Sequence, residues 1–142
     1  MIKEYRHTGL IVNDISKSRK FYCELLNLKI IQNFIEEGDY FNKLIKEKKL
    51  KAKVIKAISS DNSYVELIEF INAKKNKIKK PKRFYNVGTM HLCFTVKKID
   101  NLYKKLKKNK VKFLSPPLKS DFDPVKTFFC YDPDFNLVQF VE

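Results

Sequence analysis

The chain has 142 residues, of which 44% are hydrophobic and 13% aromatic, which is enough to form a folded core. Its formal charge of +14 comes mainly from lysine, because only Arg6, Arg19 and Arg83 among its 30 basic residues are arginine. Proteins that recognise nucleic-acid bases or grip phosphate groups through two hydrogen bonds favour arginine, so we expect no nucleic-acid partner. A positive field of this kind would instead assist the capture of a small anionic molecule.

The distribution of apolar residues and cysteines indicates a cytoplasmic protein. The chain has no run of 18 apolar residues and no apolar signal-peptide core near its first residues, so we expect no association with a membrane. Three cysteines, at 23, 93 and 130, form no CxxC pair, and their odd number does not suit a disulfide framework. They are expected to be reduced thiols.

The first half of the chain predicts a β-α-β-β-β order with one additional short helix. Helical spacing gives the main helix over 15–26, which Asp14 is placed to cap, and the additional helix at about 39–49. A turn at 60–62 joins the last two strands. Alternating or β-prone segments give the four strands, at about 4–13, 28–36, 52–59 and 63–71.

The second half repeats this order without the additional helix. A helix is expected at about 100–109, and Pro116-Pro117 marks a loop. The segment between the halves, 72–86, is charged, contains Pro81 and predicts no clear element. The strands of this half are expected at 88–97, 111–114, 125–131 and 135–141.

Two pairs of matching segments show that the chain is an internal duplication. His7 and His91 open the same pattern, with a valine five residues later and an isoleucine eight residues later, at an offset of 84. Segments 60–69 and 133–142 also match, at an offset of 73, which places Glu66 and Gln139 at equivalent positions. The two offsets differ by the length of the additional helix.

These repeat-equivalent polar residues are candidate metal ligands. A single histidine in a strand is more often an ordinary core residue than a ligand. A glutamate within an apolar strand is harder to explain, because burying a carboxylate without a partner costs several kcal/mol. Strand alternation places Glu66 on one face with Tyr64 and Ile68, and the recurrence of both residue types favours a metal site. The predicted ligands are His7, Glu66, His91 and Gln139.

With these motifs in place, the chain resembles the vicinal oxygen chelate superfamily, which includes glyoxalase I, epimerases, fosfomycin-resistance proteins and extradiol dioxygenases. The resemblance spans nearly the whole chain. It rests on His7 with the following Val12-Asn13-Asp14 and on four further segments, 21–28, 64–70, 88–96 and 131–142. The last segment contains Asp132-Pro133-Asp134, which is similar to the family's turn before its final ligand strand.

The resemblance implies an α+β fold in which two tandem βαβββ modules form a cupped mixed sheet with helices on its outer face. We expect a single domain over 1–142, with module 1 at about 1–71, a linker at 72–86 and module 2 at about 87–142. The family binds one divalent metal ion, for which Zn, Ni, Co, Fe and Mn all remain open. Pairing of the modules within one chain and pairing across a homodimer also both remain open.

Two residues depart from the family pattern. Gln139 stands where glyoxalase-like and epimerase-like members usually have glutamate, and an amide can ligate a metal but cannot act as a base. Phe135 replaces the turn glycine, so this turn is expected to adopt a different backbone shape.

The resemblance and the ligand set together predict a metal-dependent lyase or isomerase of glyoxalase I or epimerase type. Such an enzyme acts through an enediolate on a small chelating carbonyl substrate, for example a thiol adduct or a CoA thioester. A divalent ion lowers the pKa of the C–H next to the chelated carbonyl. Glu66 is the only carboxylate in the ligand set, so it is both a ligand and the candidate catalytic base.

Two alternatives remain open. His7, His91 and Glu66 form a two-histidine, one-carboxylate set that would suit a non-haem Fe(II) dioxygenase, although the family's dioxygenases carry this carboxylate at the Gln139 position. A non-catalytic, ligand-sequestering module of bleomycin-resistance type would instead be lined by aromatic residues. Cys93, two residues after His91 on the same face, is interpreted as a small apolar filler.

Overall fold

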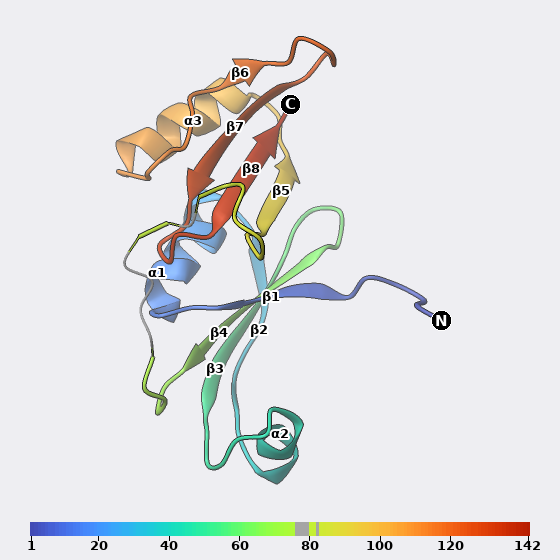
Figure 1. The fold of residues 1–142 in the computed structure, drawn as a ribbon, viewed down its shortest axis with the longest axis vertical. Coiled ribbons are helices and arrows are strands. Elements are labelled where there is room, and N and C mark those ends of the chain that lie inside the picture. Colours follow the sequence, from blue (N-terminus) through green and yellow to red (C-terminus); the bar gives the residue numbers. More distant parts are fainter. Residues whose placement is uncertain (76–79, 82) are drawn as a thin grey trace. The chain divides into compact units, whose positions relative to one another are not determined.

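The computed structural model describes residues 1–75, 80–81 and 83–142 (Figure 1). The chain divides into two compact units, Met1–Lys77 and Ile78–Glu142, and the division falls within the segment 72–86 that separates the predicted modules. No helix in the described part of the chain is long and apolar enough to cross a membrane.

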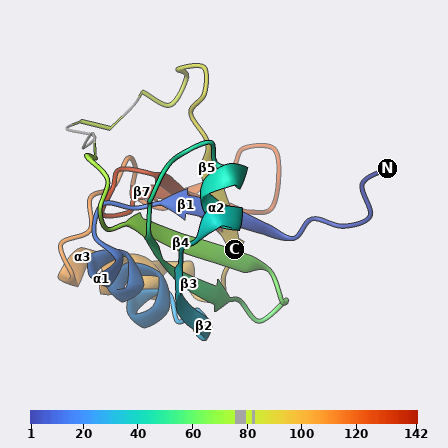
Figure 2. The same ribbon diagram turned by 90° about the horizontal axis from the view of Figure 1, so that it is seen from below.

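The first unit contains a four-stranded mixed sheet in the order β1-β4-β3-β2 (Figure 2). Strand β1 pairs with β4 in parallel, and the other neighbours are antiparallel. Its helical segments are α1 (Ile15–Arg19), the π-helix η1 (Lys20–Leu25) and α2 (Asp39–Leu44). Its strands are β1 (His7–Ile11), β2 (Lys29–Glu36), β3 (Ala52–Ile58) and β4 (Tyr64–Phe70).

The second unit repeats this topology, with a four-stranded sheet in the order β5-β8-β7-β6 and a parallel β5–β8 pair. It contains one helix, α3 (Ile99–Lys108), among its described residues. Its strands are β5 (His91–Thr95), β6 (Leu118–Lys119), β7 (Lys126–Tyr131) and β8 (Leu137–Val141). Two four-stranded mixed sheets with few helices confirm the predicted α+β class and the βαβββ order of each module.

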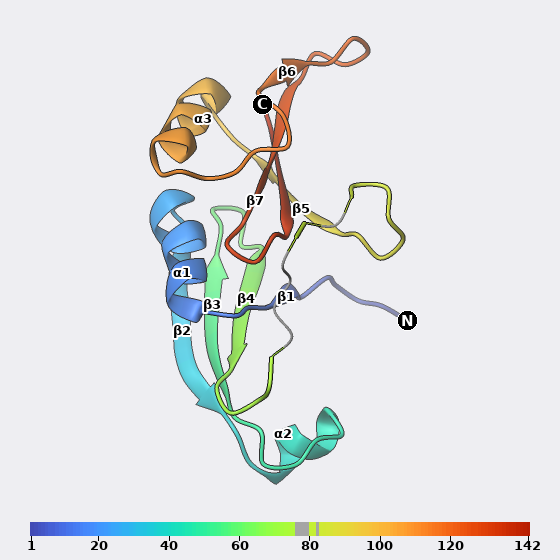
Figure 3. The ribbon, with the colours of Figure 1, turned by 60° about the vertical axis from the view of Figure 1, so that its left-hand side comes forward.

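One face of each sheet is covered by its own helix. In the first unit α1 lies along the sheet (Figure 3), and Tyr22 of η1 and Leu67 of β4 are fully buried. In the second unit Leu106 of α3, Phe128 of β7 and Val138 of β8 are fully buried. Burial of such side chains contributes roughly 1.5–3 kcal/mol each, so these helix-covered faces supply the core of each unit.

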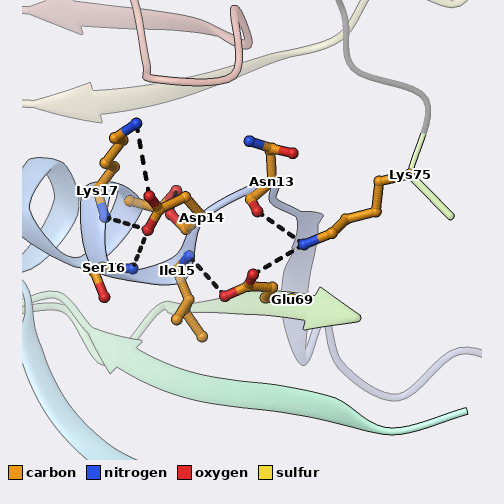
Figure 4. A network of polar contacts seen from close by, with 8 residues as sticks. Asn13, Asp14, Ile15, Ser16, Lys17, Glu69 and Lys75 are labelled. Carbon is orange, nitrogen blue, oxygen red and sulfur yellow. Dashed lines mark hydrogen bonds and ion pairs between the residues drawn. The ribbon is translucent and has the colours of Figure 1, made fainter. Parts of the chain in front are cut away.

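The N-terminus of α1 is held by two carboxylates (Figure 4). Asp14 is the predicted cap, and its Oδ1 accepts hydrogen bonds from the backbone N–H groups of Ser16 and Lys17, at 3.0 and 3.2 Å. Glu69, at the end of β4, accepts a further bond from the backbone N–H of Ile15 at 3.1 Å. Its other oxygen lies 2.9 Å from Nζ of Lys75. The first N–H groups of the helix, which lack partners within it, are thereby satisfied.

Glu142, the repeat equivalent of Glu69, has the same role in the second unit. Its carboxylate accepts hydrogen bonds from the backbone N–H groups of Lys98 and Ile99, at the start of α3. The local capping residue, Lys98, provides no side-chain bond and has a left-handed φ of 58°. The matching Glu at the end of each repeat therefore secures the fold and lies on the helix-covered face.

Three elements differ from the sequence expectation. The helix at 15–26 is present, but its second half is π-helical, with Leu26 N–H bonded to the carbonyl of Phe21. The additional helix ends at Leu44 instead of about 49. The strand expected at 111–114 is reduced to an isolated bridge between Phe113 and Cys130, and regular pairing with β7 resumes at 118–119, beyond the prolines at 116 and 117 that have no N–H to donate.

The turn at Phe135 has a backbone conformation that is typical of glycine. Phe135 has a φ of 64°, in the left-handed region that glycine favours, and the repeat-equivalent Asn62 has a φ of 67°. Asparagine tolerates this conformation, but phenylalanine is strained in it. The buried carboxylate of Asp132 compensates, because it accepts bonds from the backbone N–H groups of Asp134 and Asn136 and from the side-chain amide of Asn136.

Candidate functional site

The face opposite the helix in the first unit carries His7 and Glu66, and we call it the histidine face of that unit. Strands β1 and β4 are in register with Gly9 opposite Glu66 and His7 opposite Tyr64, so all four residues point to one side. Nε2 of His7 lies 3.5 Å from Oε2 of Glu66. The Glu66 side chain is 13% exposed and that of His7 is 40% exposed, so the carboxylate is well shielded while the imidazole remains accessible.

Lys56 is a third polar residue on this face, and it was missed in the sequence. It lies opposite Glu66 across the antiparallel β3–β4 pair, with Nζ 3.2 Å from Oε1 of Glu66. The turn at 60–62 could have revealed it, because residues 56 and 66 are equally distant from Asp61. Lys56 is a charged residue between apolar residues of β3, just as Glu66 is a charged residue between apolar residues of β4. A shielded carboxylate requires a positive partner, and the ammonium group of Lys56 provides part of that charge for Glu66.

A cavity of about 480 Å³ opens on this face. His7, Lys56 and Glu66 line it, and Glu66 is the only acid among its described lining residues. Its other described lining residues are Arg6, Ile31, Gln32 and Tyr64. A cavity of this size is in the range of small-molecule sites.

The second unit has an equivalent histidine face. Cys93 lies opposite Gln139 and His91 opposite Leu137, so His91 and Gln139 have the same register relation as His7 and Glu66. The rings of Phe84 and Phe129 lie beside His91, with centroid distances of 6.1 and 5.5 Å. The surroundings of this histidine are aromatic, whereas those of His7 are charged.

A chain of hydrogen bonds orients the Gln139 amide. The hydroxyl of Thr127 donates to the backbone carbonyl of Phe140 at 2.8 Å. With its proton used in this way, the hydroxyl accepts a bond from Nε2 of Gln139 at 3.2 Å. The amide nitrogen is thus engaged within the sheet, and Oε1 is the atom of Gln139 that would serve as a metal ligand.

Cys93 shares this histidine face and is exposed. Partial burial raises the pKa of its thiol above the ordinary value. The thiol is therefore protonated at neutral pH in the metal-free protein.

The donor atoms of His7 and Glu66 fit a divalent ion. Two ligands at about 2.1 Å from a tetrahedral or octahedral ion lie roughly 3.0–3.4 Å apart, close to the 3.5 Å between His7 and Glu66. Imidazole, carboxylate and amide oxygen are all suitable ligands for such ions. Within the described ranges, His, Cys, Asp and Glu form no group of three that could hold a metal, so the four-residue ligand set remains a prediction.

The family model of the Glyoxalase/Bleomycin resistance protein/Dioxygenase superfamily matches residues 5–140. The chain belongs to this superfamily. This membership confirms the sequence resemblance and accounts for the duplicated βαβββ topology of the two units.

Individual proteins resemble the chain over almost its full length. The uncharacterized protein YwkD of Bacillus subtilis is 28% identical over 136 residues, which cover 94% of this chain and 92% of YwkD. A glyoxalase family protein from Bacillus cereus shares the fold with a TM-score of 0.90 and 15% identity, over 100% of this chain and 95% of that one.

A fosfomycin resistance protein also shares the fold. FosX from Listeria monocytogenes, whose structure is a complex with Mn(II) and a sulfate ion, has a TM-score of 0.65 and 20% identity to this chain. The match covers 99% of this chain and 93% of FosX. At this level of identity the likeness establishes the common fold.

Proposed function

We propose that this protein is a metal-dependent lyase or isomerase of glyoxalase I or epimerase type that acts on a small chelating carbonyl substrate. One observation carries the proposal. A histidine and a carboxylate or carboxamide occupy the same register positions on the same face in both units: His7 with Glu66, and His91 with Gln139. A duplicated core would not need these polar residues at equivalent positions, whereas a shared metal ion would.

The proposed ligand set consists of His7, Glu66, His91 and Gln139, acting on one ion within a chain or between two copies. Two neutral imidazoles, one carboxylate and one amide oxygen would leave a divalent ion with a net charge near +1. When bound, such an ion supplies Lewis-acid polarisation to two adjacent substrate oxygens. The Mn(II) in the FosX complex supports a divalent ion in this fold.

Glu66 is the residue that we propose to move the proton. Its carboxylate is shielded, faces the cavity and is the only acid among the described lining residues. Removal of a proton next to a carbonyl requires a base within reach of the bound substrate. Gln139 cannot ionise, so it cannot return the proton that Glu66 takes from the substrate. Glu66 itself or water would have to return it.

A second candidate is a ligand-sequestering module without chemistry. The aromatic rings of Phe84 and Phe129 beside His91 favour it, because apolar walls supply most of the affinity in small-molecule sites. The ion pair of Lys56 with Glu66 also gives this carboxylate a partner without a metal. The two candidates differ in whether a bound metal is required.

Metal binding and turnover of the purified protein test the proposal. We expect one divalent ion per set of His7, Glu66, His91 and Gln139. His7→Ala and His91→Ala should each weaken its affinity by about tenfold or more. Thr8→Ala is the matched control, since Thr8 is adjacent to His7 but points to the opposite face. The reconstituted Ni, Zn, Fe, Co and Mn forms would be assayed against α-keto-aldehyde–thiol adducts.

Each outcome has a clear meaning. Equal affinity in the wild type and both histidine variants would contradict a metal site at these residues. Metal binding and adduct binding without turnover would favour the sequestering module. Oxygen consumption that depends on Fe(II) would indicate the dioxygenase alternative.

A further inference from the structure

Lys56 is already paired with the carboxylate that the proposed metal ion would need. Its Nζ lies 3.2 Å from Oε1 of Glu66, while the other oxygen of Glu66 lies 3.5 Å from His7. The Lys56 side chain is 33% exposed and that of Glu66 is 13% exposed, so solvent screens this pair less than an ordinary surface pair. A divalent ion at Oε2 of Glu66 would therefore neutralise the carboxylate that Lys56 now balances through Oε1.

Lys56 lines the cavity that His7 and Glu66 also line. It projects from the interior of β3, between Gln32 of β2 and Glu66 of β4 in the register of the sheet. Its Nζ lies 5.6 Å from the centroid of the Phe34 ring, which covers one side of it. Arg6 lines the same cavity, so two positive side chains would remain there once the charge of Glu66 is neutralised.

We propose that Lys56 exchanges partners during binding: it balances Glu66 in the metal-free protein and binds the acid group of the substrate once a metal ion occupies Glu66. This inference rests on the proposed function and adds the substrate class. The substrate is a small oxyanion, a carboxylate, phosphate or phosphonate, whose acid group lies near its chelating oxygens. Arg6 provides the second positive charge for that group.

The exchange predicts that metal and oxyanion assist each other. In the metal-free protein an oxyanion must compete with Glu66 for Lys56, and it also meets the negative charge of Glu66. A metal ion at Glu66 removes both obstacles, so each ligand raises the affinity of the other by the same factor. A lysine that only positions Glu66 for the metal would instead aid metal binding and have no effect on oxyanions.

The first test measures Mn(II) binding, through the EPR signal of free Mn(II), with sulfate as the oxyanion probe. Lys56→Met should tighten Mn(II) binding in the absence of sulfate by several-fold. It should weaken sulfate binding to the Mn(II)-loaded protein by about tenfold. Weaker Mn(II) binding in this variant, or unchanged sulfate binding, would overturn the exchange.

The second test needs no metal. Glu66→Gln releases Lys56 in the metal-free protein, so its sulfate affinity, measured by calorimetry, should rise by about tenfold over the wild type. The double variant Lys56→Met/Glu66→Gln should lose this gain. A gain that persists in the double variant would show that Lys56 does not bind the oxyanion.

The Lys51–Glu37 ion pair provides matched controls in the same unit, because it lies outside the described cavity lining. Lys51→Met and Glu37→Gln make the same charge changes and should alter Mn(II) and sulfate affinities by less than about twofold. The metal-free test also separates the two proposals. If no metal binds, the proposed function fails, and the sulfate affinities of the Glu66 and Lys56 variants still decide whether Lys56 is an oxyanion site.

Discussion

The two units share a backbone plan but differ in the chemistry of their histidine faces. In the first unit His7 lies beside a carboxylate that is ion-paired to Lys56. In the second unit His91 lies between aromatic rings, and the equivalent of Glu66 is the neutral Gln139, hydrogen-bonded to Thr127. The first histidine face is therefore charged, whereas the second is neutral and aromatic.

The features that the units still share are those that satisfy backbone groups. Each has a parallel pair between its first and last strand, a glutamate from the last strand at the N-terminus of its helix, and a left-handed residue in its final turn. Unpaired buried backbone groups are costly whatever the function, so these features cannot drift freely. The predicted ligands on the histidine faces do not satisfy backbone groups in this way, so we interpret the differences between the two faces as functional.

The largest expected effect is a difference in cysteine reactivity, which tests whether the sheet of the second unit has one covered and one accessible face. Cys93 is exposed on the histidine face of the second unit, whereas Cys130 is fully buried on its helix-covered face. Burial, with the nearby Asp132, raises the pKa of the Cys130 thiol to about 12. At pH 8 Cys93 should react with a thiol reagent faster than Cys130 by a factor on the order of 10³ or more.

Mass spectrometry of the labelled peptides would measure both rates, and equal rates would show that the second helix does not cover its sheet. The same raised pKa has a consequence for stability. The protonated thiol is favoured in the folded state, so its contribution is complete below about pH 9 and is lost as the pH rises toward 12. Cys130→Ala should show a smaller decline in stability than the wild type across this alkaline range.

Glu66→Gln would make the first histidine face resemble the second. It removes the proposed base and keeps an oxygen that can ligate, so turnover by the metal-loaded enzyme should fall by on the order of 10² or more. Metal content should fall much less. The measurement is kcat together with metal analysis of the same preparation. Full turnover with full metal would exclude Glu66 as the base, and Glu69→Gln provides a glutamate control on the opposite face of the same strand.

Gln139→Glu makes the reverse change, since it gives the second face the carboxylate that the first one has. An added anionic oxygen should tighten binding of Mn(II) by about tenfold and place a second base in the proposed site. Titration with Mn(II) measures the first effect, and the stereochemical course of the reaction reports the second. Unchanged affinity would indicate that Gln139 does not contact the ion. Thr127→Val, which removes the hydroxyl that orients the amide, is a useful companion variant.

The sequence was sufficient for the features that repeat. The offsets located both modules, and strand alternation placed His7 with Glu66 and His91 with Gln139, because side chains in a strand alternate strictly between its faces. It was insufficient where a partner comes from another strand. The contact of Lys56 with Glu66 depends on the register across the β3–β4 hairpin, which alternation within one strand does not reveal and only the turn at 60–62 indicates.

Rules for single residues were insufficient where other groups compensate. Phe135 was expected to change the shape of its turn because it replaces glycine, and the turn has a left-handed φ that three hydrogen bonds to Asp132 hold in place. Similarly, Glu69 and Glu142 matched in the repeat without an evident role. Their function as helix caps depends on the packing of the last strand against the helix, which sequence spacing alone does not reveal.

The smallest expected effect concerns these two caps. In the first unit α1 is capped by both Asp14 and Glu69, whereas α3 has no side-chain cap at Lys98 and depends on Glu142. Glu142→Gln should therefore destabilise the N-terminus of α3 by about 1 kcal/mol, and Glu69→Gln should affect that of α1 by less. Hydrogen exchange of the amides in the first turn of each helix measures the two effects separately.

Asp14→Ala turns this difference into a stricter test, because it leaves α1 with only the glutamate of the last strand, as in α3. In that background Glu69→Gln should cost about as much as Glu142→Gln does in the wild type, roughly 1 kcal/mol. Lys75→Met serves as the control, since it removes the ion pair of Glu69 but leaves the bond to Ile15 intact. If Glu69→Gln costs the same with and without Asp14, the two carboxylates act independently, and the presence of Asp14 would not explain a smaller effect of Glu69→Gln than of Glu142→Gln.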